Sequence, residues 1–271
     1  MQGVKQLSEL RDRLELIMSI PSGNSYVDSA SELDDVNDGY EATAYHYDWP
    51  SLLDRAGIVK VANLDRYSLP SNFRKARYVK LDGNELKETE LQFLKKSRQS
   101  YTIDLIQEDI IIRPIPTAAS DAYTLSNAES AGNAVTVELN TVSGLSQLDE
   151  IFIDSVSGTD EFSIVSSVGS GSIVTRLDAA KSASDILYRV NDIIDILFYK
   201  RITLLSAAGD KTLLPPALDY VLLEFSAYKA YSRLEMFDEA DRHYKLWLEG
   251  MARVFNAFDK VATGQSNEFS V

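Results

Sequence analysis

The spacing of apolar residues predicts two helices at the start of the chain. Over residues 4–19, leucine, isoleucine and methionine recur at steps of three and four, the period of an amphipathic helix. Residues 31–47 show the same period, and Ser31 is a residue type that caps helix N-termini. This second helix is expected to end at Asp48-Trp49-Pro50, because the residue before a proline resists the helical conformation.

Two longer helices are predicted near the end of the chain. The segment LPPALDYVLLEFSAYKAY, residues 214–231, begins with prolines that suit the first turn of a helix. Its polar residues form one narrow stripe, whereas an ordinary surface helix has one apolar stripe and a polar remainder. We therefore expect this helix to be covered from two directions. The last helix, residues 237–260, would be roughly 35 Å long.

Glu224 falls outside the polar stripe of the helix at residues 214–231. A buried glutamate without a partner would cost several kcal/mol, so this side chain needs a basic or water-lined contact. Lys200 or Arg201 of the same chain could supply it, and so could a basic residue of a second subunit. The sequence leaves both alternatives open.

Short strands are predicted between the two pairs of helices. Asp82-Gly83 lies between alternating runs and indicates a tight hairpin, and a short helix is expected at residues 88–96. A second hairpin is expected at residues 101–116, with its turn at Gln107–Asp109, and a long strand at residues 191–202.

The composition changes after Pro116. Residues 117–190 are rich in Ser, Ala, Gly, Val and Thr, and short strands alternate there with glycine-bearing turns, which is typical of a small β-barrel or β-sandwich. We therefore expect an α+β fold: a helical core with a small antiparallel sheet and long C-terminal helices, interrupted by an inserted all-β module. The predicted core is residues 1–116 with 191–262, the module is 117–190, and residues 263–271 form a flexible tail.

Composition narrows the classes of function. The chain has 271 residues, 45% of them apolar, and a net charge of −14, which disfavours binding to nucleic-acid phosphates. No stretch is apolar enough to predict a membrane span, and the first residues lack the pattern of a signal peptide. The absence of cysteine excludes disulfides and thiolate zinc sites and is consistent with synthesis in the cytosol.

The search for catalytic residues gives weak candidates. His46 could act as a base beside Asp48, but we favour a packed histidine near a helix end, and we interpret His243 as a solvated side chain. Nucleotide-binding and hydrolase motifs are absent from the sequence, and the glycine-rich GSGS reads as a turn. We expect no catalytic residues, no cofactor and no metal site.

Acidic clusters suggest carboxylate chemistry, but their spacing argues against it. Adjacent acids on one helix face or turn rarely meet the demands of a glycosidase, and the calcium-like run at 35–41 lies inside a helical pattern. These clusters comprise Glu32, Asp34, Asp35 and Asp38; Asp149 and Glu150; and Asp160 and Glu161.

Five segments follow one another in a characteristic order: LPSNFRKARYVKLDGNEL at residues 69–86, IIIRPIP at 110–116, LFYKR at 197–201, the helix at 214–233 and the last helix at 237–260. This series resembles the head-to-tail adaptor (connector) proteins of tailed bacteriophages. The order of the segments is more specific than any one of them. The resemblance covers about two thirds of the chain and excludes residues 117–190, which look like β-modules of other phage neck and tail proteins.

The resemblance implies a structural role in the virion, at the head–tail junction, after assembly in the host cytoplasm. The family forms a ring of twelve copies below the portal protein, above a downstream tail or nozzle protein, and double-stranded DNA passes through without specific binding. An acidic wall would repel DNA and let it slide. Subunit-interface residues would be Tyr220, Glu224, Tyr228 and Tyr231, and Phe269 and Val271 of the tail would anchor in the portal.

Two other functions are compatible with the sequence. In the first, a tail-associated protein uses the β-module to contact a receptor, a glycan or another tail protein. Its aromatic residues are Tyr123, Phe152, Phe162 and Tyr188. Phe152 and Phe162 sit in strand-like alternation, which favours core packing over a sugar platform. In the second, the protein is a carboxylate-dependent hydrolase, an interpretation that the missing motifs disfavour.

Overall fold

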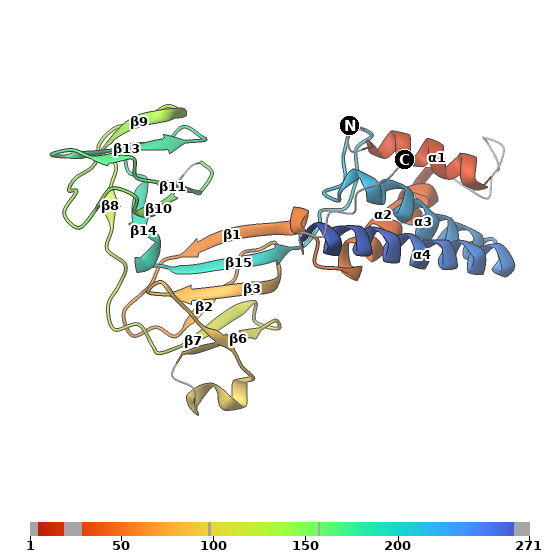
Figure 1. The fold of residues 1–271 in the computed structure, drawn as a ribbon, viewed down its shortest axis with the longest axis horizontal. Helices are drawn as coiled ribbons and strands as arrows, with labels where there is room; N and C mark the ends of the chain where they lie inside the picture. Colours follow the sequence, from red (N-terminus) through yellow and green to blue (C-terminus); the bar gives the residue numbers. More distant parts are fainter. Residues whose placement is uncertain (1–4, 19–28, 97–98, 157, 263–271) are drawn as a thin grey trace. The chain divides into compact units, whose positions relative to one another are not determined.

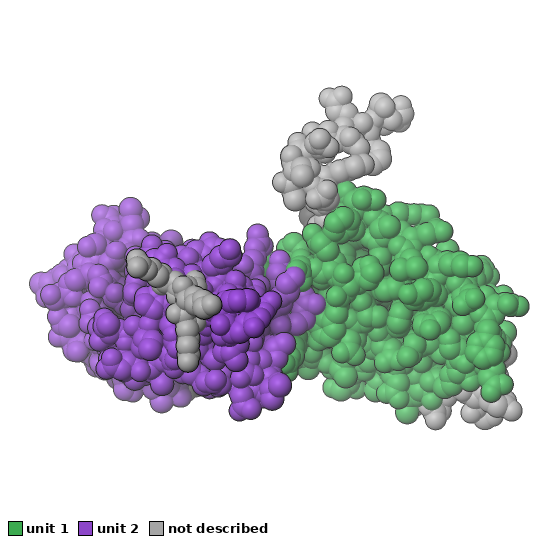
Figure 2. All heavy atoms as spheres, turned by 90° about the horizontal axis from the view of Figure 1, so that it is seen from below, with its two compact units in different colours: residues 1–53, 200–271 green, residues 54–199 purple. Residues whose placement is uncertain are grey.

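The computed structural model describes residues 5–18, 29–96, 99–156 and 158–262, and the fold is α+β (Figure 1). The chain divides into two compact units (Figure 2). Unit 1 comprises residues 1–53 and 200–271, and unit 2 comprises residues 54–199. This division differs from the predicted one, because residues 54–116 and 191–199 group with residues 117–190 rather than with the helices.

Unit 1 contains the four predicted helices. They are α1 (Leu7–Met18), α2 (Ser29–His46), α3 (Asp219–Arg233) and α4 (Phe237–Ala262). Prolines account for the end of α2 and the start of α3. Helix α2 stops before Trp49-Pro50, which opens a short 3-10 turn, and the prolines before α3 lead into another, at Pro216–Leu218.

Helix α3 lies among the other three helices of unit 1 and contacts each of them. Its buried residues therefore occupy more than one side of the helix, as the sequence predicts. Both directions are covered by the other helices of the same chain, so α3 does not need a second copy to cover it. These buried residues are Asp219, Val221, Leu222, Leu223, Glu224, Ser226, Ala227, Ala230 and Tyr231.

Two small sheets form the first half of unit 2. One has the order β1-β15-β3-β4 and the other the order β2-β7-β6-β5. The strands of the first sheet are β1 (Leu53–Ile58), β15 (Ile194–Lys200), β3 (Phe73–Leu81) and β4 (Asn84–Glu85). Those of the second are β2 (Arg66–Ser68), β7 (Asp109–Arg113), β6 (Ser100–Asp104) and β5 (Lys87–Glu88).

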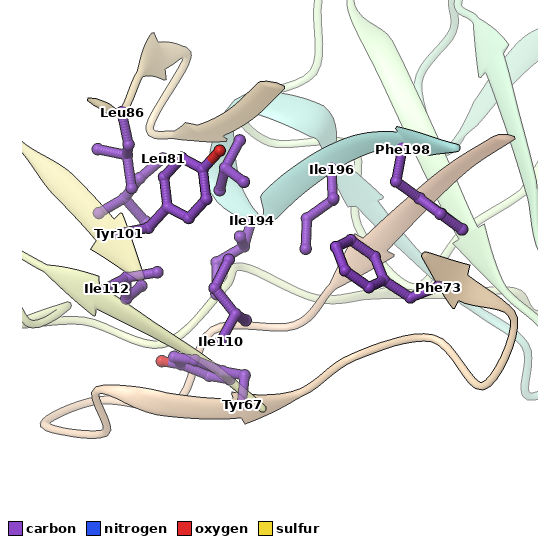
Figure 3. Packing of buried hydrophobic residues seen from close by; sticks show 11 residues of the cluster. Tyr67, Phe73, Leu81, Leu86, Tyr101, Ile110, Ile112, Ile194, Ile196 and Phe198 are labelled. Atoms are coloured by element: carbon purple, nitrogen blue, oxygen red, sulfur yellow. The ribbon is translucent and has the colours of Figure 1, made fainter. Parts of the chain in front are cut away.

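Apolar side chains of both sheets share one core (Figure 3). Ile194 and Ile196 of β15 pack in it together with Ile110 of β7. At the far end of β15, the ring of Phe198 lies 5.4 Å from that of Phe73. The alternating apolar residues that predict β7 and β15 are thus the residues of these strands that enter the shared core.

Both predicted hairpins are present. Asp82 and Gly83, each with positive φ, connect β3 to β4, where Lys80 pairs with Glu85. The turn of the second hairpin is shifted from the prediction, because Asp109 already belongs to β7 and pairs with Asp104. The predicted short helix is a 3-10 helix at Leu91–Lys96, since Glu88 lies in β5.

Residues 117–190, called the β-module below, have a core of their own within unit 2. One sheet has the order β11-β10-β14-β8 and the other the order β12-β13-β9. Ile151, Val137 and Ile173 are completely buried in that core. The strands are β8 (Tyr123–Thr124), β9 (Gly132–Glu138), β10 (Glu150–Asp154), β11 (Glu161–Ile164), β12 (Ser167–Val168), β13 (Ser172–Leu177) and β14 (Ile186–Arg189).

Candidate interaction site

A buried acid–imidazole pair joins α3 to α4. Oε2 of Glu224 lies 2.7 Å from Nδ1 of His243, and the two residues are 9% and 6% exposed. With Glu224 as a carboxylate, Nδ1 of His243 is the donor of this hydrogen bond, because a carboxylate oxygen only accepts. The ring of Tyr231 stacks on the imidazole at a centroid distance of 5.2 Å.

This pair corrects two expectations from the sequence. The partner of Glu224 is neither Lys200 nor Arg201, and His243 is buried rather than solvated. The surrounding sequence, DEADRHYK, is strongly polar and therefore indicated a solvated side chain. The spacing of His243 from Ala240 and Trp247, three and four residues away, places it in the buried stripe of α4 and could have indicated the contact.

The predicted interface residues of α3 lie on the side that faces α4. Tyr231 is buried and donates a hydrogen bond from its hydroxyl to the carbonyl oxygen of Met18. Tyr228 is half-buried, and its ring lies 5.2 Å from that of Tyr244 on α4. These two tyrosines therefore make contacts within the chain, while Tyr220 is 58% exposed.

A groove of about 260 Å³ lies between α3 and α4. Glu224 and Tyr220 both line it, so the structure brings together two of the four predicted interface residues. Gly250 allows the close approach of the helices, because a Cβ there would lie 3.0 Å from Cγ2 of Val221. The groove is lined by Tyr220, Val221, Glu224, Leu246, Glu249, Gly250, Arg253 and Val254.

Helix α4 carries a second apolar stripe beside its buried one. Phe237, Tyr244, Leu248 and Phe255 recur at steps of seven and four, and each is exposed by 39% or more. A further groove of about 300 Å³ follows this stripe and is lined by His46, Tyr47, Leu248, Met251, Ala252 and Phe255. His46 packs its ring edge-on to Trp247 at 5.0 Å, in agreement with the expectation of a packed histidine.

Three of the four acids that the sequence singles out on α2 form ion pairs within unit 1, and the fourth, Asp34, is exposed. Glu32 binds Arg11 at 2.8 Å, Asp38 binds Lys229 at 2.9 Å, and Asp35 binds Arg233. Burial raises the pKa of Asp35 to about 6, although Arg233 acts in the opposite direction.

Two acids of the β-module, Glu161 and Asp160, make contacts inside the module. Glu161 binds the buried Lys181 at 2.8 Å, and Asp160 accepts a hydrogen bond from the backbone N–H of Ser155. Among the residues that the structure describes, no cluster of three or more His, Asp and Glu side chains is placed to hold a metal ion.

A polar cluster connects the β-module to the sheet β1-β15-β3-β4. Arg55 of β1 binds Asp195 of β15 through two hydrogen bonds, of 2.7 and 3.0 Å, and also binds Glu150 of β10. Its guanidinium lies 4.2 Å from the ring centroid of Phe162. Arg55 therefore links strand β10 of the β-module to strands β1 and β15 within unit 2.

The aromatic residues of the β-module do not form an exposed platform. Tyr123, Phe152 and Tyr188 are buried, and Phe162 lies beneath Arg55. The expectation of core packing is confirmed for Phe152, whereas Phe162 is only partly buried. Phe269 and Val271, the predicted portal anchors, lie outside the described residues.

Within the described part of the chain, no helix has the length and apolar character needed to cross a membrane. Comparison of the sequence with protein-family models and with curated proteins finds no match in either case.

Proposed function

We propose that this protein is a structural component of a phage virion, a head-to-tail adaptor without catalytic activity. In this proposal twelve copies form a ring below the portal protein and continue the channel through which DNA leaves the head. The motif order supports it: a hairpin at Asp82-Gly83, a second hairpin that leads to Pro116, the strand β15, and then α3 and α4.

The observation that carries the proposal is the second apolar stripe of α4. Phe237, Tyr244, Leu248 and Phe255 are exposed in the single chain, although they continue the apolar surface of a well-formed helix. Exposed apolar patches of this kind mark surfaces that a partner covers. Helix α4, rather than α3, is thus the helix whose apolar surface exceeds what one chain covers.

The charge of the chain is consistent with the proposed channel. Each copy has a net charge of −14, so a ring would present an acidic surface to DNA, which itself carries about one charge per 1.7 Å. Repulsion of like charges would keep the DNA from adhering to the wall. We place the downstream tail or nozzle protein at the opposite end of the ring from the portal.

The mass of the assembled particle tests the proposal. The protein, alone or mixed with portal, should give a particle of about twelve copies of 30.2 kDa each. The double variant Leu248→Asp/Phe255→Asp places two charges in the stripe. It should fold but fail to assemble, and so remain a single chain. Lys245→Asp adds an acid on the same helix outside the stripe and should assemble normally. Wild-type protein that stays monomeric with portal would overturn the proposal.

The tail supplies a separate test of the portal contact. Removal of residues 263–271, which contain Phe269 and Val271, should abolish the capture of portal and leave the copy–copy contacts unchanged. Portal capture by the shortened chain at wild-type strength would refute the assignment of these two anchors.

An alternative role for the β-module follows from its exposed apolar side chains. Leu148, Val156 and Ile164 are largely exposed, which suits contact with another protein better than contact with a glycan. If the protein is instead a tail-associated binding protein, the isolated chain should bind a tail protein or a receptor. A glycan screen with clear hits would contradict the preference for a protein partner.

A further inference from the structure

Glu224 has an unusual position for a buried carboxylate. Oε2 of Glu224 forms a hydrogen bond with His243, whereas Oε1 has no hydrogen-bond partner among the described residues. The side chain is about nine-tenths buried and yet lines the groove between α3 and α4. A desolvated carboxylate attracts a cation more strongly than an exposed one, because water screens it less.

The remaining walls of the groove define the group that fits it. Tyr220, Val221, Leu246 and Val254 present apolar surface, and Gly250 lets Val221 of α3 approach α4 closely beside them. The two charged residues at the rim, Glu249 and Arg253, bind each other at 3.4 Å. A cationic head on an apolar stem, as in arginine or lysine, matches an apolar-walled groove with one carboxylate inside it.

The chain carries a suitable cation on its other unit. Residues 54–113 hold 12 of the 27 Lys and Arg residues and 9 of the 41 Asp and Glu residues, so this segment is basic in an acidic protein. Strand β3 has the sequence FRKARYVKL, and its Arg77 is exposed. Among the described residues, no carboxylate pairs with Arg77, whereas Arg66, Arg233 and Arg253 each contact one.

We propose that the groove between α3 and α4 binds the guanidinium of Arg77 from a second copy of this chain, with Glu224 as the acceptor. The contact joins two different surfaces, a groove on unit 1 and a strand on unit 2, so it is heterologous and can close a ring. This inference rests on the proposed ring assembly and identifies one of its subunit contacts.

Charge variants of the assembled protein test the contact. Arg77→Glu should weaken copy–copy association at least about 10-fold, as should Glu224→Gln, which keeps an acceptor for His243 but removes the charge. Arg77→Lys should retain most of the association. The matched controls are Lys87→Glu, an equal charge change on exposed β5, and Glu249→Gln at the groove rim, and both should associate like wild type. Wild-type association of Arg77→Glu would overturn the proposal, whatever Glu224→Gln does to folding.

A disulfide test locates the contact directly, because the chain has no cysteine of its own. Copies with Leu246→Cys, mixed with copies carrying Lys75→Cys, should cross-link under mild oxidation, because Leu246 lines the groove and Lys75 lies two residues from Arg77 on the same face of β3. Rings that form without this cross-link would overturn the contact and leave the adaptor proposal intact. Protein that forms no assembly, even with portal, would overturn the adaptor proposal and with it this contact.

Discussion

Gly39 of α2 and Ser226 of α3 approach each other so closely that no side chain fits between them. A Cβ on Gly39 would lie 2.3 Å from Oγ of Ser226 and 2.4 Å from the carbonyl oxygen of Leu222. Oγ of Ser226 already donates to that carbonyl at 3.0 Å. The two helices therefore meet backbone to backbone at this point, which brings the apolar faces of α2 and α3 into contact.

Substitution of Gly39 by alanine should destabilise unit 1 by about 3 kcal/mol. Alanine favours a helix more than glycine does, but here the methyl group meets a backbone oxygen that can move only if the helices separate. Urea denaturation monitored by tryptophan fluorescence would measure the change, because both tryptophans, Trp49 and Trp247, lie in unit 1.

Gly209→Ala is the matched control for this prediction, since a Cβ there would meet no atom within 4 Å. It should alter the free energy of unfolding by less than about 0.5 kcal/mol. If Gly39→Ala were equally harmless, the close crossing of α2 and α3 would be incorrect.

Local chemistry made much of the fold predictable. The turn at Asp82-Gly83 depends on two adjacent residues that tolerate positive φ, and the helices depend on spacing within about twenty residues. The division into units was not predictable, because distant contacts determine it. For example, the backbone N–H of Leu213 donates to the hydroxyl of Tyr40, a residue 173 positions away.

The candidate site was predicted in part and for the same physical reason. The helical position of Glu224 correctly indicated a buried carboxylate in need of a partner. The partner, His243, lies on the next helix in a strongly polar stretch, so only its register with Trp247 indicated burial. Periodicity predicts that α4 is an apolar-striped helix, but it does not tell which of two neighbouring stripes the chain covers.

Thr43 provides a second test of unit 1. Its Oγ1 accepts a hydrogen bond of 3.1 Å from Nε1 of Trp247, and both residues are buried. Thr43→Val preserves the shape but leaves the indole N–H without a partner, so it should cost about 1–3 kcal/mol. Thr43→Ser keeps the hydroxyl and should cost less. If Thr43→Val were no more destabilising than Thr43→Ser, the hydrogen bond would contribute no more to stability than the packing of the methyl group.

The pH dependence of stability should report on Asp35. Burial raises the pKa of Asp35 to about 6 in the folded chain, above its ordinary value of 3.8. The folded state thus binds the proton more tightly than the unfolded state, and the resulting stabilisation is complete below about pH 3.8 and disappears as the pH rises through 6. Wild type should lose on the order of 1 kcal/mol relative to Asp35→Asn between pH 4 and 7, because the proton that stabilises the folded state dissociates over this range.

The comparison of slopes, rather than of absolute stabilities, isolates this effect, because Asp35→Asn also weakens the contact with Arg233. Glu41→Gln, at an exposed position of the same helix, should leave the pH dependence unchanged. A wild-type slope identical to that of Asp35→Asn would be incompatible with a raised pKa at this position.

Arg55 should be the most sensitive position of unit 2. Asp195 is 1% exposed, and Arg55 supplies its charged partner through two hydrogen bonds. Arg55→Met would leave that buried carboxylate without a counter-charge, at a cost of about 3–5 kcal/mol, whereas Arg55→Met/Asp195→Leu should recover much of the loss. Hydrogen exchange should accelerate in β1, β10 and β15 of Arg55→Met.

The fluorescence of the two tryptophans, both in unit 1, should remain unchanged at the temperature where exchange in β1 and β15 increases. Arg176→Met serves as the control, because the pair of Arg176 with Asp178 is exposed on both sides and should contribute less than about 1 kcal/mol. If Arg55→Met were no more damaging than Arg176→Met, the cluster would not hold the β-module to its sheet. In that case, apolar packing around Gly57 would hold the β-module to the sheet. Phe152 and Ile193 pack closely there, because a Cβ added to Gly57 would lie within 3 Å of either side chain.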